Sequence, residues 1–522
     1  MPQTTLSERT ASRVQTVPDA VARAVAEYGD AEALVDGGTR WSFAELGERV
    51  YRCAGAMIAA GVARGDRVAI WAPNGHRFVV TALGALVAGA TVVPVNTRYK
   101  GDEARWIIEK SRARALFVEN HFLGLDYVEM LGAAPFSDLV DVVRLDGAGE
   151  LTWEAFLERG GRVPREDVLS RGQEVAASDL SDVFFTSGTT GRPKGVMTNH
   201  SQNIRVCEAW GNGVGLRRGD RYLVVNPMFH SFGYKAGLIA CLLHGVTLVT
   251  QAVFDVASTL DLIEAERITV LPGAPTLYAS ILDHPRSATA DTSSLRLAVT
   301  GAAVVPVSLI ERLRSDLFPE VIVAYGLTET CGTVTIGDPT ASAEAISRTV
   351  GRPIEGTEVC IVGEDGERLP TGASGEIYVR GVNVMQGYLD DDVETAKAID
   401  EDGWLHTGDV GRFDDEGFLR ITDRLKDMFV VGGFNAYPAE IEQVIARHPA
   451  VSEVAVVGVP DERLGEVGRA YVVARQGHHA DGADIIAHCR ERLANFKVPR
   501  SVVFLEELPH NSSGKVVKFA LR

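Results

Sequence analysis

The chain has few cysteines and no long apolar stretch, and both features exclude whole classes of protein. Six cysteines are scattered through 522 residues without a Cys-x-x-Cys pair, which argues against a disulfide framework and against a zinc site. No run approaches the roughly eighteen apolar residues that a membrane-spanning helix needs. The first twenty residues also lack the apolar core of a secretory signal. We therefore expect a cytoplasmic protein without a transmembrane segment.

The chain also has fewer positively charged than negatively charged residues. Lys and Arg total 52 against 70 Asp and Glu, which gives a net charge of −18. Such a field repels nucleic acid and anionic lipid, so we expect small-molecule partners and no nucleic acid. Hydrophobic residues (46%) and charged residues (23%) occur at the levels of ordinary globular proteins, and the length exceeds what one core usually supports. We expect several packed units, and a homodimer is left open.

The distribution of apolar residues predicts an α/β fold. Residues 54–65 and 76–90 are typical of helices, and 66–72 and 91–95 of buried strands. Further β-branched runs up to about residue 326 end in glycine, and ligands bind where strands of such sheets end. After about residue 352, short strands separated by turns predict an antiparallel, β-rich subdomain. From about residue 428 onward, the pattern predicts helix, strand, helix and strand in a small α+β domain.

The segment 186–195, Thr-Ser-Gly-Thr-Thr-Gly-Arg-Pro-Lys-Gly, follows an apolar strand and has the composition of a phosphate-binding loop. Its glycines let backbone N–H groups approach an anion, its hydroxyls can donate, and Lys194 adds positive charge. The spacing differs from that of the P-loop of kinases and GTPases, which weakens those interpretations. By composition alone, a flexible turn is an equal alternative.

This segment resembles the signature of the adenylate-forming superfamily, which includes acyl-CoA synthetases, luciferases and adenylation domains of peptide synthetases. Seven further motifs of that superfamily follow in the expected order: NPMFHSFG (226–233), TGAA (300–303), YGLTET (325–330), GWLHTGD (403–409), DRLKD (423–427), GGFNAYPAEIE (432–442) and NSSGK (511–515). The resemblance extends from about residue 20 to the end of the chain. It implies a large N-terminal domain of wound α/β subdomains plus a β-rich subdomain, with a small, mobile α+β domain after it.

The resemblance also implies a reaction with ATP, Mg²⁺ and coenzyme A. A carboxylate attacks the α-phosphate of ATP to give acyl-AMP and pyrophosphate, and the thiol of coenzyme A then displaces AMP. In this scheme, Thr328 and Glu329 serve the α-phosphate and Mg²⁺, with Thr190 as a second metal ligand. Hydroxyl donors and at least one carboxylate are what a phosphate chain with its metal requires. The loop residues implied to hold the leaving phosphates are Thr186, Ser187, Gly188, Thr189, Thr190, Gly191 and Lys194.

The same resemblance implies how adenosine is bound. Tyr325 is similar to the ring that stacks on adenine, and small residues form the opposite wall: Gly301, Ala302 and Ala303. Asp409 corresponds to the aspartate that accepts hydrogen bonds from both ribose hydroxyls, a task that suits a carboxylate. Arg424 corresponds to a second ribose contact.

The C-terminal motifs imply a mobile domain. Lys426 matches the hinge, so we place the domains at 1–425 (AMP-binding) and 426–522 (its associated C-terminal domain). Lys515 is similar to the lysine that neutralises developing charge during adenylation. Gly432 and Gly433 are similar to glycines that line the tunnel for the thiol arm of coenzyme A.

The acyl group is implied to lie near His230, Tyr234, Lys235, Gly301, Leu327 and Cys331, with His230 as an aromatic gate. Lys235 is unusual, because an unpaired cation in an apolar stretch is costly. It either meets a polar group of the substrate or pairs with a nearby acid, and both alternatives stay open here. The segments around it resemble actinobacterial ligases that activate the bicyclic propionate left after steroid ring cleavage. A fatty acid is the other expected substrate class.

Other activities share these adenylation motifs. An amide synthetase or an acyl-AMP ligase would differ only in the acceptor, an amine or a carrier protein in place of coenzyme A. No inserted segment of the carrier-specific type is seen near the domain junction, which favours coenzyme A. A luciferase would need an oxygen pocket that motifs do not reveal. A non-catalytic nucleotide-binding regulator is disfavoured because Glu329, Asp409 and Lys515 are all present.

Overall fold

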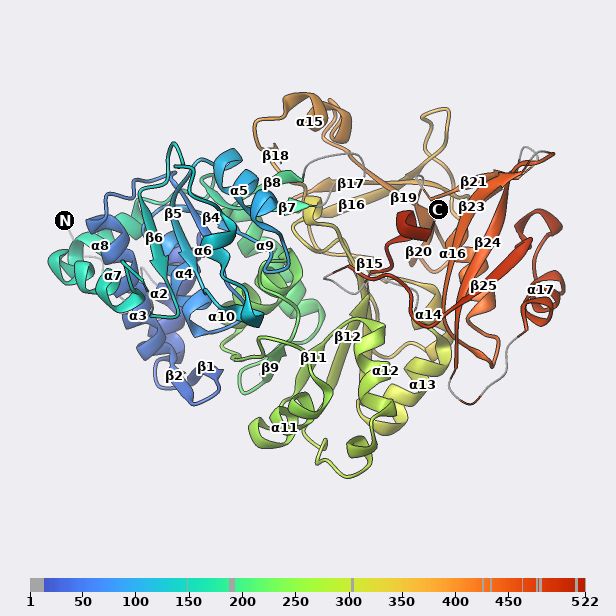
Figure 1. The fold of residues 1–522 in the computed structure, drawn as a ribbon, viewed down its shortest axis with the longest axis horizontal. Coiled ribbons are helices and arrows are strands. Elements are labelled where there is room, and N and C mark those ends of the chain that lie inside the picture. The colour runs from blue at the N-terminus through green and yellow to red at the C-terminus, as the bar shows by residue number, and fades with distance from the viewer. Residues whose placement is uncertain are drawn as a thin grey trace, which may run out of the picture. The chain divides into compact units, whose positions relative to one another are not determined.

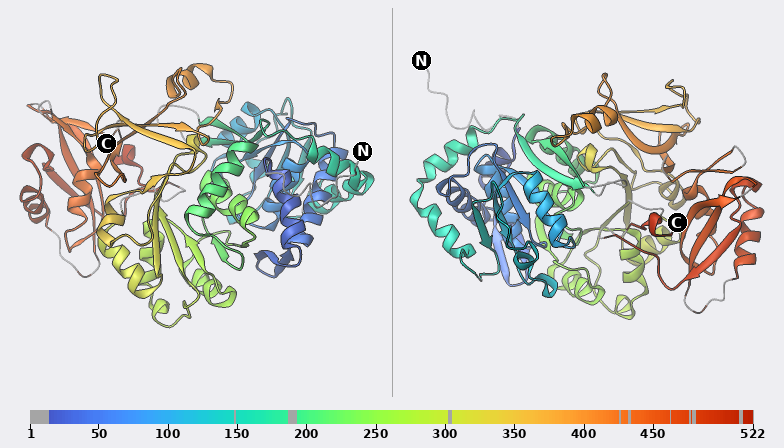
Figure 2. Two further views of the ribbon diagram at one scale, coloured as in Figure 1. Left: turned by 180° about the vertical axis from the view of Figure 1, so that it is seen from behind. Right: turned by 45° about the horizontal axis from the view of Figure 1, so that its top comes forward.

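The computed structural model shows two compact units, whose elements are labelled in Figure 1 and seen from two further directions in Figure 2. Unit 1 comprises Met1–Leu271, Leu327–Thr333 and Val382–Ala396, and unit 2 comprises Pro272–Gly326, Val334–Gly381 and Lys397–Arg522. Among the described residues, no helix is both long and apolar enough to cross a membrane. The structure describes residues 14–147, 149–186, 193–301, 305–424, 427–431, 434–461, 463–475, 477, 481–511 and 515–521.

Unit 1 contains a seven-stranded sheet. In spatial order its strands are β18 (Gly387–Tyr388), β8 (Lys194–Asn199), β7 (Leu180–Thr186), β4 (Thr91–Pro94), β3 (Arg67–Trp71), β5 (Ala113–Val118) and β6 (Asp141–Arg144). The strands from β7 to β6 are parallel, whereas β8 runs antiparallel to β7 and β18 antiparallel to β8. Strands β3 and β4 are buried almost throughout, as expected for parallel strands covered on both faces.

Helices beside this sheet confirm the alternation predicted from the sequence. The helix expected over 54–65 is the end of a longer helix, α3 (Phe43–Ala59), and α4 (His76–Val87) lies between β3 and β4 in the chain. α3 packs against α4 (Figure 1). It begins at a capping box, in which Ser42 and Glu45 each accept a hydrogen bond from the other's backbone N–H. The other helices that cover this part are α2 (Val17–Tyr28), α5 (Gly101–Lys110), α6 (Tyr127–Met130), α7 (Trp153–Arg159), α8 (Arg165–Gln173) and α9 (His200–Gly213).

A second group of strands in unit 1 pairs in the order β2 (Thr39–Ser42), β1 (Glu32–Asp36), β10 (Thr247–Thr250), β9 (Arg221–Val224) and β11 (Val270–Pro272), the last residue of which belongs to unit 2. Strands β9 and β10 are parallel neighbours. Between them in the chain, Phe232–Ile239 forms a π-helix that continues as α10 (Ala240–His244), and α11 (Val256–Glu266) follows β10. π-helical turns are rare in proteins overall, and those that occur often lie at functional sites. This one carries Tyr234 and Lys235.

Unit 2 contains two parallel strands that end in site motifs. β12 (Leu297–Gly301) pairs in parallel with β13 (Glu320–Tyr325), and β14 (Thr335–Ile336) and β15 (Arg352–Pro353) add antiparallel. The helices here are α12 (Pro275–Asp283), α13 (Val307–Asp316) and α14 (Ala343–Arg348).

The antiparallel subdomain predicted after residue 352 is present. It is a four-stranded sheet in the order β16 (Thr357–Val362), β17 (Gly375–Gly381), β19 (Leu405–Phe413) and β20 (Leu419–Arg424), with antiparallel pairing throughout. A short helix, α15 (Asp392–Ala398), precedes β19.

The C-terminal α+β region is also present, and its described residues form three strands more than expected: β21 (Phe429–Val431), β22 (Phe434–Ala436) and β24 (Gly465–Ala474). The predicted order of helix, strand, helix and strand corresponds to α16 (Pro438–Ile445), β23 (Val451–Asp461), α17 (Gly482–Arg490) and β25 (Ser501–Leu505). In the sheet, β24 lies between β23 and β25 (Figure 1). Strands β21 and β22 complete it. The buried core of this region includes Phe429, Ile441, Val456, Val472 and Ile485. The boundary at 425/426 stays a prediction, because residues 425 and 426 lie outside the described residues.

Candidate active site

The two ends of the predicted phosphate loop are held together by strand pairing in unit 1. Thr186 ends β7, Lys194 begins β8, and the two residues are register partners. The Thr186 hydroxyl donates to the Lys194 carbonyl oxygen at 3.5 Å. The predicted loop residues between them lie outside the described residues: Ser187, Gly188, Thr189, Thr190 and Gly191.

Lys194 has two neighbours from a distant part of the sequence. Its ammonium group forms an ion pair with Glu394 on α15, and it lies 4.9 Å from the ring centre of Tyr388 on β18. Both members of the ion pair are about one-third exposed. A lysine in this position can pair with an anion that reaches it from solvent, because its charge is not fully withdrawn from water.

Glu329 is held by the same tyrosine. It lies in the short 3-10 turn η5 (Thr328–Thr330), which follows the end of β13. The Tyr388 hydroxyl donates to Glu329 Oε1 at 3.1 Å, and the Met385 N–H donates to the Glu329 carbonyl oxygen at 2.9 Å. Burial and the nearby Glu329 charge raise the pKa of Tyr388, so its phenol remains a donor at neutral pH.

The described residues contain no cluster of three or more His, Cys, Asp or Glu side chains able to hold a metal ion. One carboxylate nevertheless suits Mg²⁺, which usually keeps several waters and is bound by one or two carboxylates together with substrate phosphates. Glu329 is half-buried and next to the half-buried Thr328, so this donor set fits that mode of binding.

Lys235 pairs with an acid, which is one of the two alternatives left open by the sequence. Its Nζ lies 3.0 Å from Asp182 Oδ1, and the two side chains are 2% and 0% exposed. Nζ also donates to the Thr198 hydroxyl at 2.8 Å and to Cys331 Sγ at 3.3 Å. Burial lowers the pKa of Lys235, but Asp182 and its other partners outweigh that effect and raise it overall, so the lysine stays charged.

Cys331 is tied into the same buried network. Burial raises the pKa of its thiol to about 11, and the protonated thiol donates to Asn203 Oδ1 at 3.1 Å. Asn203 in turn donates to Asp182 and to the Ser181 hydroxyl. Cys331 has a left-handed backbone with φ of 54°, which is strained for a non-glycine residue. The network therefore holds a strained residue two positions after Glu329.

The other predicted acyl-site residues of unit 1 differ in burial. Tyr234 is fully buried against Phe184, and its hydroxyl has no hydrogen-bond partner among the described residues. His230 and Leu327 are half-buried, and the His230 ring lies 4.9 Å from that of Phe229. Their proposed contacts with a substrate stay predictions, as does the substrate contact of Lys235.

Unit 2 brings together two predicted nucleotide residues that are 84 positions apart. The Tyr325 hydroxyl, at the end of β13, donates to Asp409 Oδ2 on β19 at 2.7 Å, and both side chains are buried. Asp409 is the register partner of Arg424 on β20. This geometry places the predicted adenine and ribose residues next to each other.

Gly301 ends β12 directly beside this pair. It is the register partner of Ala324, the residue before Tyr325. A Cβ at position 301 would lie 2.4 Å from the Ala324 carbonyl oxygen, so only glycine fits there. Ala302 and Ala303 lie outside the described residues.

The C-terminal site residues are only partly described. The Lys515 backbone is held by Asn511, whose side chain accepts from the Lys515 N–H at 2.9 Å and whose N–H donates to the Lys515 carbonyl oxygen at 2.8 Å. The predicted hinge Lys426 and the predicted tunnel glycines Gly432 and Gly433 lie outside the described residues.

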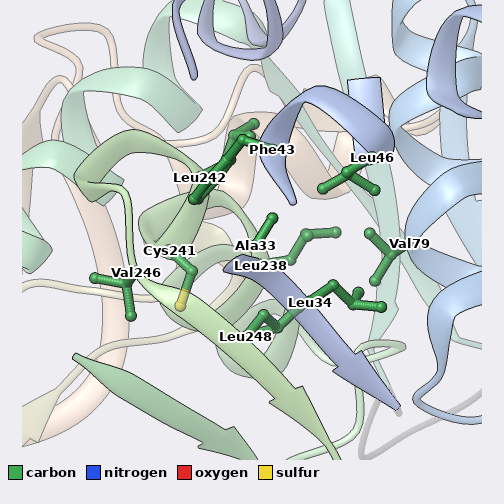
Figure 3. Close-up of a pocket in the computed structure, with 10 residues that line it drawn as sticks. All are labelled: Ala33, Leu34, Phe43, Leu46, Val79, Leu238, Cys241, Leu242, Val246 and Leu248. Atoms are coloured by element: carbon green, nitrogen blue, oxygen red, sulfur yellow. The ribbon is translucent and has the colours of Figure 1, made fainter. Parts of the chain in front are cut away.

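A small apolar pocket in unit 1 is a feature of core packing. Its side chains gather around β1 and β10, where Leu34 and Leu248 are register partners (Figure 3). The only ionisable group among the ten lining residues is the Cys241 thiol, whose pKa burial raises well above its ordinary value. Because a site for an organic acid needs polar groups to orient the carboxylate, this pocket does not match the predicted one.

Comparison with known proteins identifies relatives over almost the full length. The chain is 51% identical to the 3-[(3aS,4S,7aS)-7a-methyl-1,5-dioxo-octahydro-1H-inden-4-yl]propanoyl:CoA ligase of Rhodococcus jostii, over 97% of this chain and 98% of the relative. It is 50% identical to the ligase of the same name from Mycobacterium tuberculosis, over 98% and 99% of the two chains. A feruloyl-CoA synthase from Amycolatopsis is 38% identical over 94% and 95%.

A solved structure gives the same result for the fold. The anthranilate CoA ligase AuaEII, in complex with anthranoyl-AMP, superposes with a TM-score of 0.87 at 27% identity, over 97% of this chain and 96% of that one. Family models for "AMP-binding enzyme" and "AMP-binding enzyme C-terminal domain" match residues 21–389 and 440–515. The predicted α/β fold class, the resemblance to adenylate-forming CoA ligases and the enzyme class of an acid–thiol ligase are confirmed. The chain belongs to the AMP-binding enzyme family.

Proposed function

We propose that this protein is an ATP-dependent acyl-CoA synthetase for a carboxylic acid that carries a fused bicyclic ring. The observation that carries the proposal is the identity of 51% and 50%, over nearly the whole chain, to two CoA ligases with the same bicyclic propanoyl group in their names. The reaction joins the acid to AMP, with release of pyrophosphate, and then transfers the acyl group to the thiol of coenzyme A.

In this proposal, residues of unit 1 serve the phosphates. The β- and γ-phosphates of ATP are held, as they leave, by Lys194, Thr186 and the loop between these two residues. Glu329 and Thr190 would hold Mg²⁺, which would neutralise charge on the phosphate oxygens. The partial exposure of Lys194 in its ion pair with Glu394 supports this assignment, because a phosphate can reach the ammonium group from solvent.

Residues of unit 2 serve the nucleoside. Tyr325 stacks on adenine, and Asp409 and Arg424 bind the ribose hydroxyls. The hydrogen bond between the Tyr325 hydroxyl and Asp409 supports this pairing of roles, since it fixes the ring and the carboxylate relative to each other. Lys515 supplies the charge that stabilises the adenylation transition state, a contact typically worth roughly a hundred- to thousandfold in rate.

We propose coenzyme A as the acceptor, with its thiol arm passing Gly432 and Gly433 after rotation about Lys426. The named relatives are CoA ligases, which supports coenzyme A over an amine or a carrier protein. The domains 1–425 and 426–522, the cytoplasmic location and the homodimer left open above stay predictions.

A substrate panel tests the proposal. The enzyme is mixed with Mg²⁺, ATP and one acid at a time: 3-(7a-methyl-1,5-dioxo-octahydro-1H-inden-4-yl)propanoic acid, ferulic acid, hexanoic acid and dodecanoic acid. Pyrophosphate release is recorded first, and thioester is then identified by mass spectrometry after coenzyme A is added. We expect kcat/KM for the bicyclic acid to exceed that for each other acid by at least about tenfold, which equals about 1.4 kcal/mol of transition-state binding.

Each part of the proposal can fail separately. Equal or higher kcat/KM with an unbranched acid would contradict the substrate class and leave the enzyme class standing. Pyrophosphate release followed by AMP release with an amine, but not with coenzyme A, would contradict the acceptor. Absence of pyrophosphate with every acid would contradict acyl adenylation itself.

A further inference from the structure

Tyr388 contacts both charged residues that are assigned to the phosphates. Its hydroxyl donates to Glu329 Oε1 at 3.1 Å, and its ring centre lies 4.9 Å from Lys194 Nζ. The three residues come from separate segments of unit 1, at positions 194, 329 and 388. One side chain therefore fixes the positions of a cation and a carboxylate that the sequence places far apart.

The backbone around Tyr388 makes this contact rigid. β18 pairs with β8, so that Tyr388 faces Val196, two residues after Lys194. On one side of Tyr388 the Leu389 N–H donates to the Gly195 carbonyl oxygen at 2.7 Å, and on the other the Met385 N–H donates to the Glu329 carbonyl oxygen at 2.9 Å. The segment 385–389 is thus hydrogen bonded to both groups of phosphate residues.

The side chain itself has little freedom to move. Tyr388 is 8% exposed, and its backbone N–H donates to the Thr395 hydroxyl at 2.8 Å. Thr395 belongs to α15, the helix that also carries Glu394, the ion-pair partner of Lys194. A hydrogen bond from a buried, immobile phenol orients the Glu329 carboxylate before any ligand arrives. Such pre-organisation avoids reorganisation when charge must be stabilised.

We propose that Tyr388 is a positioning residue for adenylation, which holds Glu329 in the orientation needed for Mg²⁺–ATP. This inference rests on the proposed function. Tyr388 acts through Glu329 and Lys194 and makes no contact with the reacting atoms. Its role belongs to the first half-reaction only, since the second half-reaction uses acyl-AMP and coenzyme A after pyrophosphate and its metal have left.

The test uses Tyr388→Phe, which removes the hydroxyl and keeps the ring beside Lys194. Tyr127→Phe is the matched control, because Tyr127 is also buried in unit 1 and its hydroxyl donates to the Thr97 carbonyl oxygen at 2.8 Å. Calorimetry with α,β-methylene-ATP, which cannot react, gives its affinity with and without Mg²⁺. We expect Tyr388→Phe to weaken binding in Mg²⁺ by about five- to tenfold and binding without Mg²⁺ by less than twofold.

Kinetics and a double-mutant cycle complete the test. We expect Tyr388→Phe to slow pyrophosphate release about tenfold or more, and to leave the conversion of supplied acyl-AMP to thioester unchanged. In a Glu329→Gln background, the same change should have little further effect on Mg²⁺-dependent binding, because its target carboxylate is gone. Tyr127→Phe should lower the thermal midpoint of unfolding and leave the Mg²⁺ dependence as in the wild type.

The inference is overturned if Tyr388→Phe binds the analogue in Mg²⁺ with wild-type affinity, or if its effect is fully additive with Glu329→Gln. It is also overturned if both half-reactions slow equally, since that result indicates a general structural role. Failure of the proposed function looks different: the wild type would then release no pyrophosphate with any acid, while the binding measurements would still compare Tyr388→Phe with the wild type.

Discussion

Lys235→Met removes the cation of a buried ion pair, and its cost can be worked out from the structure. The change deletes the Nζ that lies 3.0 Å from Asp182 Oδ1 and leaves a carboxylate with 0% exposure. Methionine is of similar length and apolar, so it fills most of the same volume without creating a large cavity. The main consequence is an uncompensated negative charge in the core of unit 1.

Removing one partner of a buried pair typically costs about 3–5 kcal/mol. Asp182 retains hydrogen bonds from Thr198 and Asn203. These bonds partly compensate the charge, so we expect a loss of free energy of unfolding near the lower end, about 3 kcal/mol. This amount is a large fraction of the stability of an ordinary domain.

Urea unfolding at pH 7 measures the loss, and two further variants isolate its cause. Lys235→Met combined with Asp182→Asn should recover at least half of the lost stability, because the amide removes the buried charge. Lys497→Met is the matched control: its Nζ lies 2.6 Å from Glu440, but the side chains are 22% and 39% exposed. Partly exposed pairs are worth less than about 1 kcal/mol, so this variant should unfold nearly as the wild type does.

Substrate kinetics decide between the two roles that the sequence left open for Lys235. A structural role predicts that the folded fraction of Lys235→Met loses activity with the bicyclic acid and with hexanoic acid in the same proportion. The reasoning is refuted if Lys235→Met keeps wild-type stability and loses activity only with the bicyclic acid. That result would show a direct contact between the lysine and a polar group of the substrate.

Three further changes test other parts of the molecule. Lys515→Ala should lose at least about a hundredfold in acid-dependent pyrophosphate exchange and keep thioester formation from supplied acyl-AMP; equal loss of both would contradict its role. Glu394→Gln removes the ion-pair partner of Lys194, so calorimetry should show that ATP binds a fewfold more tightly. Weaker binding would show that Glu394 contributes to ATP binding instead. Burial lowers the pKa of His200 from 6.5 to about 4, so the unfolded chain takes up the proton first. As the pH falls from 6.5 to 4, the free energy of unfolding should therefore decrease by roughly 3 kcal/mol from its value above pH 6.5. Urea unfolding at several pH values should show this decrease in the wild type and not in His200→Asn.

The parts of the fold that could be predicted are those with a strong local pattern. β3 and α4 are buried almost throughout, and a continuous apolar run marks such elements directly. β24 was not predicted, although its ten residues form the long pairing with β23. It begins with Gly-Glu-Val-Gly-Arg, and glycine and charge weaken the alternation that marks a strand. Its pairing partners define it more than its own residues do.

The candidate site divides in the same way. The motifs predict roles for Lys194, Glu329, Tyr325 and Asp409, because each motif is a short run of residues that can be read locally. Tyr388 was missed, since its function depends on contacts with segments 59 and 194 positions away and no local pattern records them. The sequence did show that Lys235 needs a partner.

The identity of that partner had one usable signal. Asp182 is the lone acid of β7 and directly precedes the apolar run Val183-Phe184-Phe185, and a buried charge in that position requires compensation. Two lone charges of opposite sign, each in an apolar segment, are therefore candidates for one buried pair. Spacing alone does not connect them, because the two residues are 53 positions apart.

The buried pair and Tyr388 together explain how Glu329 is held. Tyr388 fixes its carboxylate directly, and the Lys235 network fixes the backbone that follows, through Cys331 in its strained left-handed conformation. Strain of that kind persists only where the surroundings determine it, and the contacts of Cys331 with Lys235 and Asn203 are those surroundings. If the network relaxes, the turn that carries Glu329 can relax with it. The folded fraction of Lys235→Met should therefore lose more of the Mg²⁺-dependent first half-reaction than of the second, even though Lys235 contacts neither ATP nor metal in this account.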